Sequence, residues 1–207
     1  MCWKYKRFDE HVHKINKSLS ILKATAIYGA NGSGKTNLFK ALLLLNGVAT
    51  EQEFLLTKTA RKINQPFLLN PKFKNQTSKF ELDFSINGRL YFYQLEIKGE
   101  VIIYENLSQI KNDSPNVIIE RKANPDNPNQ QIINLGDRKI DTTEDDYSQS
   151  LFKPSTSVLS LGIGVARTIK VWMKKNIQFL FPDYEIQDLP YILSRNNKNL
   201  QLANQIL

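Results

Sequence analysis

One short segment, residues 29–36, constrains the fold of this chain more than any other feature. It reads Gly-Ala-Asn-Gly-Ser-Gly-Lys-Thr, which is the complete pattern G-x-x-x-x-G-K-[ST]. Gly29, Gly32 and Gly34 let the backbone turn tightly and approach an anion closely. The amide groups of residues 32–36 can then surround that anion, and the helix that starts here adds its positive N-terminal end. The segment therefore predicts a phosphate-binding loop.

The end of the loop has the chemistry that a nucleotide and its metal ion need. The Lys35 ammonium is placed to reach the β- and γ-phosphates, and the Thr36 hydroxyl is placed to ligate Mg²⁺. We assign these consecutive residues to the nucleotide site: Gly29, Ala30, Asn31, Gly32, Ser33, Gly34, Lys35, Thr36 and Asn37.

The residues on both sides of the loop favour the strand–loop–helix arrangement that the motif requires. Residues 24–28 form a short apolar, β-prone run, which predicts a buried parallel strand. Residues 37–45 are strong helix formers, and Gly47 stands where a glycine commonly ends a helix.

The composition fits one globular domain, or one domain with a small insertion. The chain has 207 residues, 41% of them hydrophobic, so it can bury a core. Cys2 is the only cysteine, which excludes an intrachain disulfide. The N-terminus has no apolar signal segment, and the longest apolar run, residues 41–45, is far shorter than the roughly 20 residues that cross a bilayer. We expect a cytoplasmic protein that has no membrane partner.

Positive charge is concentrated near the N-terminus. The formal net charge is +8, and residues 1–40 contribute +6 of it, with eight Lys or Arg against Asp9 and Glu10. Such a segment suits the phosphate backbone of a nucleic acid. The alternative is a solvated strand edge protected by lysines. We favour the alternative, because arginine and aromatic residues do not alternate along the segment.

Alternation of polar and apolar residues predicts an antiparallel sheet in the middle of the chain. Residues 80–86 alternate strictly, and Asn87-Gly88 follows, which is the strongest short hairpin signal. We expect three to five strands that include residues 80–86, 90–97, 101–104 and 117–120, besides short strands near 11–15 and 18–22.

The C-terminal part combines a polar segment with a helical pattern. Residues 122–155 are rich in Asn, Asp, Pro, Gln and Ser, which predicts a surface excursion. Residues 154–157 supply N-capping chemistry, apolar residues from Val158 to Leu180 recur at helical spacing, and residues 199–207 resemble a further helix. We expect these divisions: 1–50 (strands, loop and helix), 51–121 (antiparallel β subdomain), 122–155 (polar excursion) and 156–207 (helical segment, its core truncated at the C-terminus).

Two features that complete an ATPase are missing or ambiguous. Phosphoryl transfer requires a carboxylate that organises Mg²⁺, but no apolar run ends in Asp-Glu, and Asp183 follows Pro182, which cannot donate to a central sheet ladder. Residues 159–162, Leu-Ser-Leu-Gly, match the Leu-Ser-x-Gly signature of ATP-binding-cassette (ABC) ATPases. Both leucines also fit the apolar face of a helix, and we favour that packing role.

The loop and its neighbours resemble a known family. The run from Tyr28 to Leu38 looks like the phosphate loop of ABC-type ATPase heads of the chromosome-maintenance and recombination-repair type. A closer resemblance is to bacterial AAA-type ATP-binding proteins linked to abortive infection and other phage defence. In those proteins the loop precedes a Pro-Phe-x-Leu segment, here residues 66–69, and a Phe-Glu-x-x-Phe strand, here residues 80–84.

The resemblance implies an α/β fold, namely a P-loop NTPase lobe of ABC-ATPase type with an antiparallel β subdomain. It implies ATP and Mg²⁺ as cofactors, Lys35 and Thr36 in the roles given above, and a homodimer or larger assembly of the full-length protein, with an effector protein as a further partner. The family has a metal-site glutamine between loop and β subdomain, and either Gln65 or Gln76 fits it. Its acidic strand, signature helix and switch histidine have no counterpart here, so we expect an incomplete lobe.

Several functions stay open at this point. The first is an ATPase lobe, in phage defence or a DNA-related process, whose hydrolysis requires residues outside this chain. We then expect negligible turnover by the isolated chain. The second is an ATP-sensing module without turnover, and the third is a non-functional remnant. A P-loop kinase for a small molecule is the alternative of another class, although only Arg121 and Arg138 are available for its lid. DNA binding follows from the family and the basic N-terminal segment.

Overall fold

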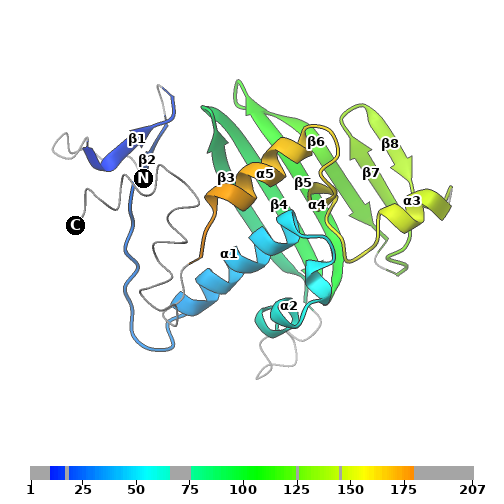
Figure 1. The fold of residues 1–207 in the computed structure, drawn as a ribbon, viewed down its shortest axis with the longest axis horizontal. Helices are drawn as coiled ribbons and strands as arrows, with labels where there is room; N and C mark the ends of the chain where they lie inside the picture. The colour runs from blue at the N-terminus through cyan, green and yellow to red at the C-terminus, as the bar shows by residue number, and fades with distance from the viewer. Residues whose placement is uncertain (1–9, 17–18, 66–75, 125, 145, 180–207) are drawn as a thin grey trace. The chain divides into compact units, whose positions relative to one another are not determined.

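A computed structural model describes residues 10–16, 19–65, 76–124, 126–144 and 146–179 (Figure 1). Residues Met1–Asn176 form one compact unit and residues Ile177–Leu207 form a second. All helices and strands named below belong to the first unit. The expected helix at 199–207, the Pro-Phe-x-Leu segment and Asp183 lie outside the described residues.

Two short strands near the N-terminus form an antiparallel pair, as the alternation predicts. They are β1 (Val12–Lys14) and β2 (Ser20–Leu22), with His13 opposite Ile21. Between the two strands, the Asn16 side chain accepts a hydrogen bond from the Leu19 amide (2.8 Å).

Six further strands form one antiparallel sheet in which each strand pairs with its neighbours in sequence. The expected hairpin at Asn87-Gly88 is confirmed: both residues have positive φ, 50° and 76°, which suits the twist of the flanking strands. This sheet has six described strands, one more than the largest number that we expected for it. The strands are β3 (Ser78–Ile86), β4 (Arg89–Lys98), β5 (Val101–Lys111), β6 (Ser114–Ala123), β7 (Gln131–Leu135) and β8 (Arg138–Asp141).

Within the segment at 122–155, residues 131–141 extend this sheet by two strands, which the polar composition did not predict. Its polar composition conceals Ile133 and Ile140, which pair directly across β7 and β8. Ile133 is fully buried, and the turn between the strands uses Gly136, whose φ is +59°. A short helix, α3 (Asp146–Leu151), follows. The strand pair thus places an apolar residue of each strand in register, which composition alone did not reveal.

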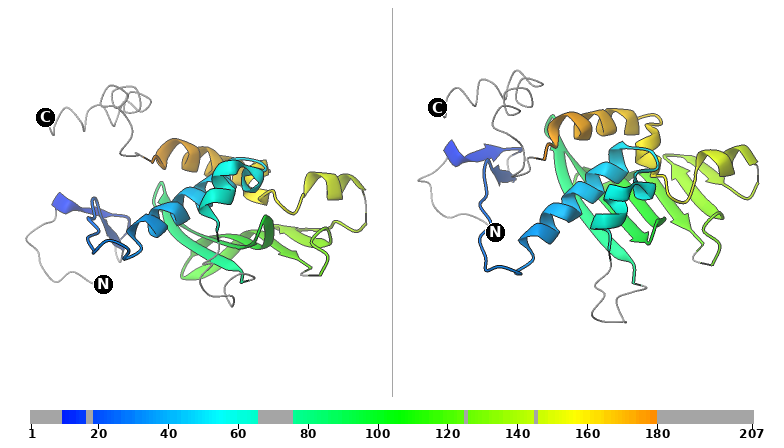
Figure 2. Two further views of the ribbon diagram at one scale, coloured as in Figure 1. Left: turned by 90° about the horizontal axis from the view of Figure 1, so that it is seen from below. Right: turned by 60° about the horizontal axis from the view of Figure 1, so that its bottom comes forward.

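Helices cover one face of the sheet, as Figure 2 shows. They are α1 (Lys35–Thr50), α4 (Val158–Leu161) and α5 (Ala166–Asn176), while the 3₁₀ turn η2 (Phe54–Leu56) and α2 (Lys58–Ile63) follow α1. The core lies between these two layers. Tyr93, Leu95, Leu107 and Ile119 of the sheet have no exposed surface. None of the described helices is long and apolar enough to span a membrane.

Helix α1 continues past Gly47, so the glycine does not end the helix as expected. The ring of Phe54 packs on Gly47, and a Cβ at this position would lie 2.4 Å from the Phe54 Cζ atom. Gly47 is therefore needed for close approach rather than for a left-handed backbone. The helix ends at Thr50, where the Glu51 amide donates to the Gly47 carbonyl.

The apolar pattern from Val158 to Leu180 predicts one helix, but the described residues form two. Gly162 and Gly164 both have positive φ, 67° and 57°, which breaks the helix between α4 and α5. Val165, expected on the buried face, is 58% exposed because it lies in this break. Ser157 caps α4 as its chemistry predicts, accepting a hydrogen bond from the Ser160 amide (3.2 Å).

The residues before the phosphate loop do not form the buried parallel strand that we expected. Residues 24–30 have no regular secondary structure, and Ile27 and Tyr28 are 57% and 90% exposed. A strand requires a neighbour that pairs with its amide and carbonyl groups. No described strand lies in register with this segment.

Candidate phosphate-binding site

The predicted phosphate loop is the turn immediately before α1, and all its residues are exposed. Gly32 and Gly34 have φ values of 82° and 92°, in the left-handed region that glycine favours. The Ser33 amide donates to the Ala30 carbonyl (3.2 Å), and the Gly34 carbonyl accepts from the Asn37 amide (2.9 Å). The loop is thus a closed turn that leads directly into the first turn of the helix.

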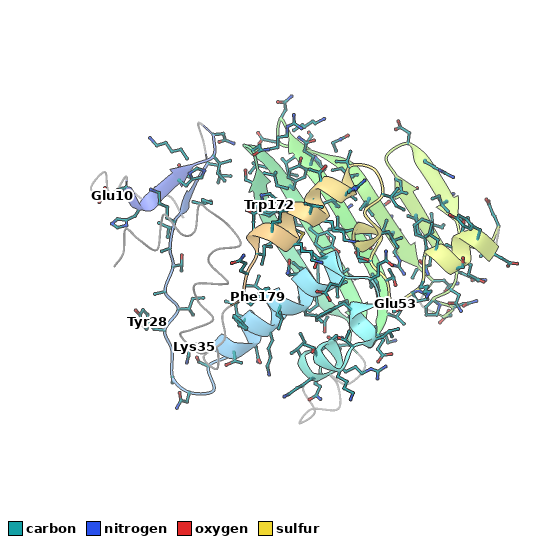
Figure 3. The ribbon with its side chains drawn as sticks, in the orientation of Figure 1. Glu10, Tyr28, Lys35, Glu53, Trp172 and Phe179 are labelled. Carbon is teal, nitrogen blue, oxygen red and sulfur yellow. The ribbon has the colours of Figure 1, made fainter. Side chains whose placement is uncertain are left out.

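Lys35 folds back over this loop. Its Nζ atom donates to the carbonyl oxygens of Gly29 (2.5 Å) and Ala30 (2.8 Å) and lies 3.5 Å from the Ser33 Oγ. A Cβ at Gly29 would lie 2.5 Å from the same Oγ, so the Ser33 side chain would have to turn away to admit one. Figure 3 shows Lys35 at the N-terminal end of α1. The loop backbone thus holds the Lys35 ammonium against its own carbonyl groups.

The start of α1 is electrostatically positive. No side chain caps this helix, and its first turn contains no acidic residue. The first carbonyl that accepts within the helix is that of Gly34, and it is paired with Asn37 and Leu38, so the amides of Lys35 and Thr36 have no partner within the helix. The helix end carries roughly half a positive elementary charge, to which the Lys35 ammonium adds. Such an arrangement favours a phosphate group.

The other predicted site residues remain untested as ligands. Thr36, Asn31 and Asn37 are exposed in the loop and the first helical turn, whereas Gln65 and Gln76 are exposed on either side of a segment that the structure does not describe. Within the described ranges, no three His, Cys, Asp or Glu side chains are grouped as metal ligands. The roles of Thr36 and Gln65 at Mg²⁺ stay predictions.

The Leu-Ser-Leu-Gly segment is part of the core. Leu159 and Ser160 have no exposed surface, and the Ser160 hydroxyl donates to the Ser157 carbonyl (2.7 Å). The Ser160 carbonyl also accepts from the Lys170 ammonium. Ser160 thus uses its polar groups within the fold, which agrees with the packing role favoured from the sequence.

A buried carboxylate holds α4 on the sheet. Glu105 of β5 accepts hydrogen bonds from the Ser157 hydroxyl (2.6 Å) and from the amides of Val158 (2.8 Å) and Leu159 (3.0 Å). The Tyr93 hydroxyl donates to the same group (3.1 Å). A negative charge is favourable at a helix N-terminus because it meets unpaired amides and the positive end of the helix.

Arg121 lies directly across the strand pair from Glu105 and holds the chain just before α4. Its guanidinium donates to the carbonyl oxygens of Thr156 (2.6 Å), Lys153 (3.1 Å) and Pro154 (3.2 Å). Burial lowers the pKa of Arg121 to about 10, while the charge of Glu105 acts to raise it. The group therefore stays positively charged at neutral pH.

Sequence reasoning missed this Glu105–Arg121 network, although a signal was present. Leu107 and Ile119 pair across β5 and β6, and Glu105 and Arg121 are the next inward-facing pair. Opposite charges at such positions indicate a buried polar network rather than a solvated strand. A β-bulge between Leu107 and Ser108 interrupts the alternation of inward- and outward-facing residues, so a prediction that assumes regular strands assigns the faces wrongly.

Comparison with known proteins identifies the family. A family model described as "AAA domain, putative AbiEii toxin, Type IV TA system" matches residues 24–158, about two thirds of the chain. The chain belongs to this family. The resemblance to AAA-type proteins of abortive infection is thereby confirmed. An AAA domain is a P-loop NTPase, a nucleotide-binding module. No curated protein and no solved structure matches the chain.

The AAA-family match and the loop geometry are consistent with each other. The matched range begins just before the phosphate loop and ends at the first residue of α4. It includes the loop, α1 and the whole six-stranded sheet. The sheet and the loop therefore belong to one family domain, although the sheet alone, which is antiparallel, gives no indication of nucleotide binding.

Proposed function

We propose that this chain is the ATP-binding lobe of an AAA/ABC-type ATPase that acts in phage defence or a related process. The observation that carries the proposal is Lys35, whose ammonium is held over a loop with open amides at the start of α1. A triphosphate would bring negative charge to both the Lys35 ammonium and the open amides. The Thr36 hydroxyl, one residue further into the helix, would hold Mg²⁺, and the ion would supply positive charge against the phosphates.

We propose further that the nucleotide site is composite. The N-terminal half of α1 exposes Leu38 (48%) and Leu42 (42%), and the segment before the loop exposes Ile27 (57%). Apolar side chains beside a nucleotide loop suit coverage by a further part of an ATPase, either from a longer chain or from a second subunit. Hydrolysis then requires groups from that part, and an assembly with itself or with an effector follows from the same requirement.

The test compares Lys35→Ala with Lys40→Ala, which removes a lysine of the same helix outside the loop motif. Binding of a fluorescent ATP analogue is measured with and without Mg²⁺. We expect Lys35→Ala to weaken binding at least about tenfold, equivalent to 1.4 kcal/mol, and Lys40→Ala to have little effect. Equal affinity of both variants and the unsubstituted chain would exclude the loop as the nucleotide site.

Phosphate release distinguishes the two ATP-dependent alternatives. We expect negligible hydrolysis by this chain alone, because phosphoryl transfer needs a carboxylate that organises the metal and a group that orients water. Turnover that depends on Lys35 would contradict the composite site. An ATP-sensing module would bind ATP and release no phosphate even when its assembly partner is present. A small-molecule kinase would instead transfer phosphate to an added acceptor.

A further inference from the structure

The hairpin formed by β1 and β2 leaves its apolar side chains uncovered. Ile21 and Leu22 of β2 are 48% and 44% exposed, and no residue of either strand is buried. In the described part of the chain, the two strands pair only with each other. A hairpin of two strands is marginally stable in water, and a third strand gives it an apolar face to bury. The hairpin is therefore an incomplete sheet.

Strand β3 is an edge of the six-stranded sheet and lacks the features that protect an edge. Among the described strands it pairs only with β4, over nine residues without a bulge or a proline. Phe84 stacks on Trp172 of α5, so Phe80 and Leu82 also lie on the face beneath the helices, which carries no charged residue of β3. An edge that stays free is normally short, charged or bulged. β3 is therefore suited to accept a further strand.

The hairpin and this edge are close to each other at one end. The Ile15 carbonyl oxygen, directly after β1, lies 3.9 Å from where a Cβ of Gly88 would stand, directly after the end of β3. β2 begins at this same end of the hairpin, because Ser20 pairs with Lys14. β2 thus starts where β3 ends, which is the direction that antiparallel pairing requires.

We propose that β2 docks on the free edge of β3 as an antiparallel strand and joins the two described sheets into one. The structure shows the hairpin undocked. The proposed register places these residues opposite each other: Ile21 and Ser85, Leu22 and Phe84, Lys23 and Asp83. Leu22 then lies on the face beneath the helices, together with Val12, its partner in β1. A shift by one residue would move both apolar side chains to the outer face of the sheet.

Charge supports this register. Lys23 and Asp83 are both exposed, and neither forms an ion pair within the described residues. Opposite charges directly across two strands stabilise their pairing. A shift by two residues would keep the same faces but place Lys23 opposite Ser85, which is uncharged, or Glu81, which is already bound to Lys79 (2.8 Å). The proposed register is the one that pairs two charges without a partner.

Docking affects the phosphate loop through the chain between them. Only residues 23–28 separate β2 from Gly29, and residues 24–30 have no regular secondary structure. A strand that is fixed on the sheet edge restrains the position from which the loop starts. The docking itself does not depend on nucleotide binding, so the two proposals can fail separately.

The experiment traps the docked strand by a disulfide in the full chain. The test variant carries Ile21→Cys and Ser85→Cys in a Cys2→Ser background, because directly opposed residues of antiparallel strands lie within disulfide reach. The control replaces Ser85→Cys by Lys139→Cys, which is exposed on β8 at the other edge. Oxidised glutathione is added, and peptide mass spectrometry follows the intramolecular disulfide. We expect it to form at least about tenfold faster in the test variant.

Charge reversal tests the register. In the test variant, Lys23→Glu or Asp83→Lys alone should slow formation of the disulfide several-fold, because each places like charges opposite each other. The double reversal Lys23→Glu/Asp83→Lys should restore the rate, which free movement of the hairpin does not predict. Failure of the double reversal to restore the rate would overturn the proposed register.

Other results overturn the docking itself. Equal rates in the test and control variants mean that the hairpin has no preferred partner, and a disulfide-linked dimer as the main product means that a second copy occupies β3. Hydrogen exchange supplies a test without cysteines. Leu22→Asp changes a side chain that the undocked hairpin exposes, so exchange in β3 should accelerate only if β2 protects that strand. Unchanged exchange in β3 would refute the proposal.

Discussion

The two halves of α1 lie in different environments although they belong to one continuous helix. In the C-terminal half, Leu45 and Val48 are 3% and 1% exposed and form part of the core between the helices and the sheet. In the N-terminal half, Leu38 and Leu42 are 48% and 42% exposed, beside a phosphate loop that faces solvent. The described residues thus complete a core at one end of α1 and leave the nucleotide end uncovered.

The polar groups differ in the same way between these regions. Around Glu105, the amides at the start of α4 are paired with a carboxylate that the protein itself supplies. At the start of α1 no acidic residue is supplied, and the equivalent amides stay open. The start of α4 is therefore neutralised by a carboxylate of the protein, whereas the start of α1 is available to an anion from outside. The following experiments test this division, beginning with the largest expected effect.

Replacement of Arg121 by Met should destabilise the fold most. The change removes the side-chain donor of the buried Thr156 carbonyl, one of the two donors of the Lys153 and Pro154 carbonyls, and the positive charge beside Glu105. Loss of one partner from a buried charged network costs about 3–5 kcal/mol. The control is Lys122→Met, because Lys122 follows Arg121 in the chain but is exposed on the other face of the sheet. Urea denaturation followed by circular dichroism measures both, and equal stability of the two variants would refute the structural role of Arg121.

Leu45→Ala and Leu42→Ala compare the two halves of α1 directly. Both remove the same atoms from the same helix, but only Leu45 is in the core. We expect Leu45→Ala to lower the free energy of unfolding by about 2–5 kcal/mol, and Leu42→Ala to change it by less than about 0.5 kcal/mol. A large loss from Leu42→Ala would mean that the loop end of the helix is covered in the isolated chain.

The same division explains which parts of the fold were predictable. The loop and the β3–β4 hairpin were found because local chemistry determines them: glycine at the phosphate turn, and Asn87-Gly88 between alternating strands. The strand at 24–28 was expected from its composition, but a strand also requires a partner, which no local pattern supplies. β7 and β8 were missed for the opposite reason, since partners exist there for a segment of polar composition.

The site was predictable only at the level of the motif. Residues 29–36 match a pattern whose fixed positions each have a physical role, whereas the choice between Gln65 and Gln76 depends on distances that a linear pattern does not contain. Glu105 and Arg121 were missed because each appears as an ordinary strand charge until the register places them opposite each other beneath α4. Long-range pairing of buried polar groups is the information that a single sequence provides least.

Gly47→Ala should destabilise the chain, although alanine is normally the better helix former by roughly 1 kcal/mol. The new methyl group would overlap the Phe54 ring, with contacts of 2.4–2.6 Å to three ring carbons. Overpacking of this kind costs about 1–3 kcal/mol. The double variant Gly47→Ala/Phe54→Leu should recover part of the loss, because a smaller side chain makes room for the methyl group. A single variant as stable as the unsubstituted chain would contradict the close packing.

The smallest effect that we expect is a loss of stability at alkaline pH that is caused by Tyr93. Burial above all, and then the charge of Glu105, raise the pKa of Tyr93 well above its usual value. The folded state therefore keeps this proton more strongly than the unfolded state, so stability falls as the pH rises through about 10, the unfolded pKa of tyrosine. We expect the decline to be steeper in the unsubstituted chain than in Tyr93→Phe.

The comparison with Tyr93→Phe isolates this proton from other groups. Arg121, with its pKa lowered to about 10, titrates in the same range with the opposite sign, but it does so in both proteins. Tyr104→Phe is the matched control: burial also raises the pKa of Tyr104, but this side chain is only partly buried on the outer face of the sheet. Its slope should differ less from that of the unsubstituted chain. Parallel stability curves for all three proteins above pH 10 would contradict the burial of Tyr93 beside Glu105. The contrast between this buried region and the exposed phosphate loop would then lose its support.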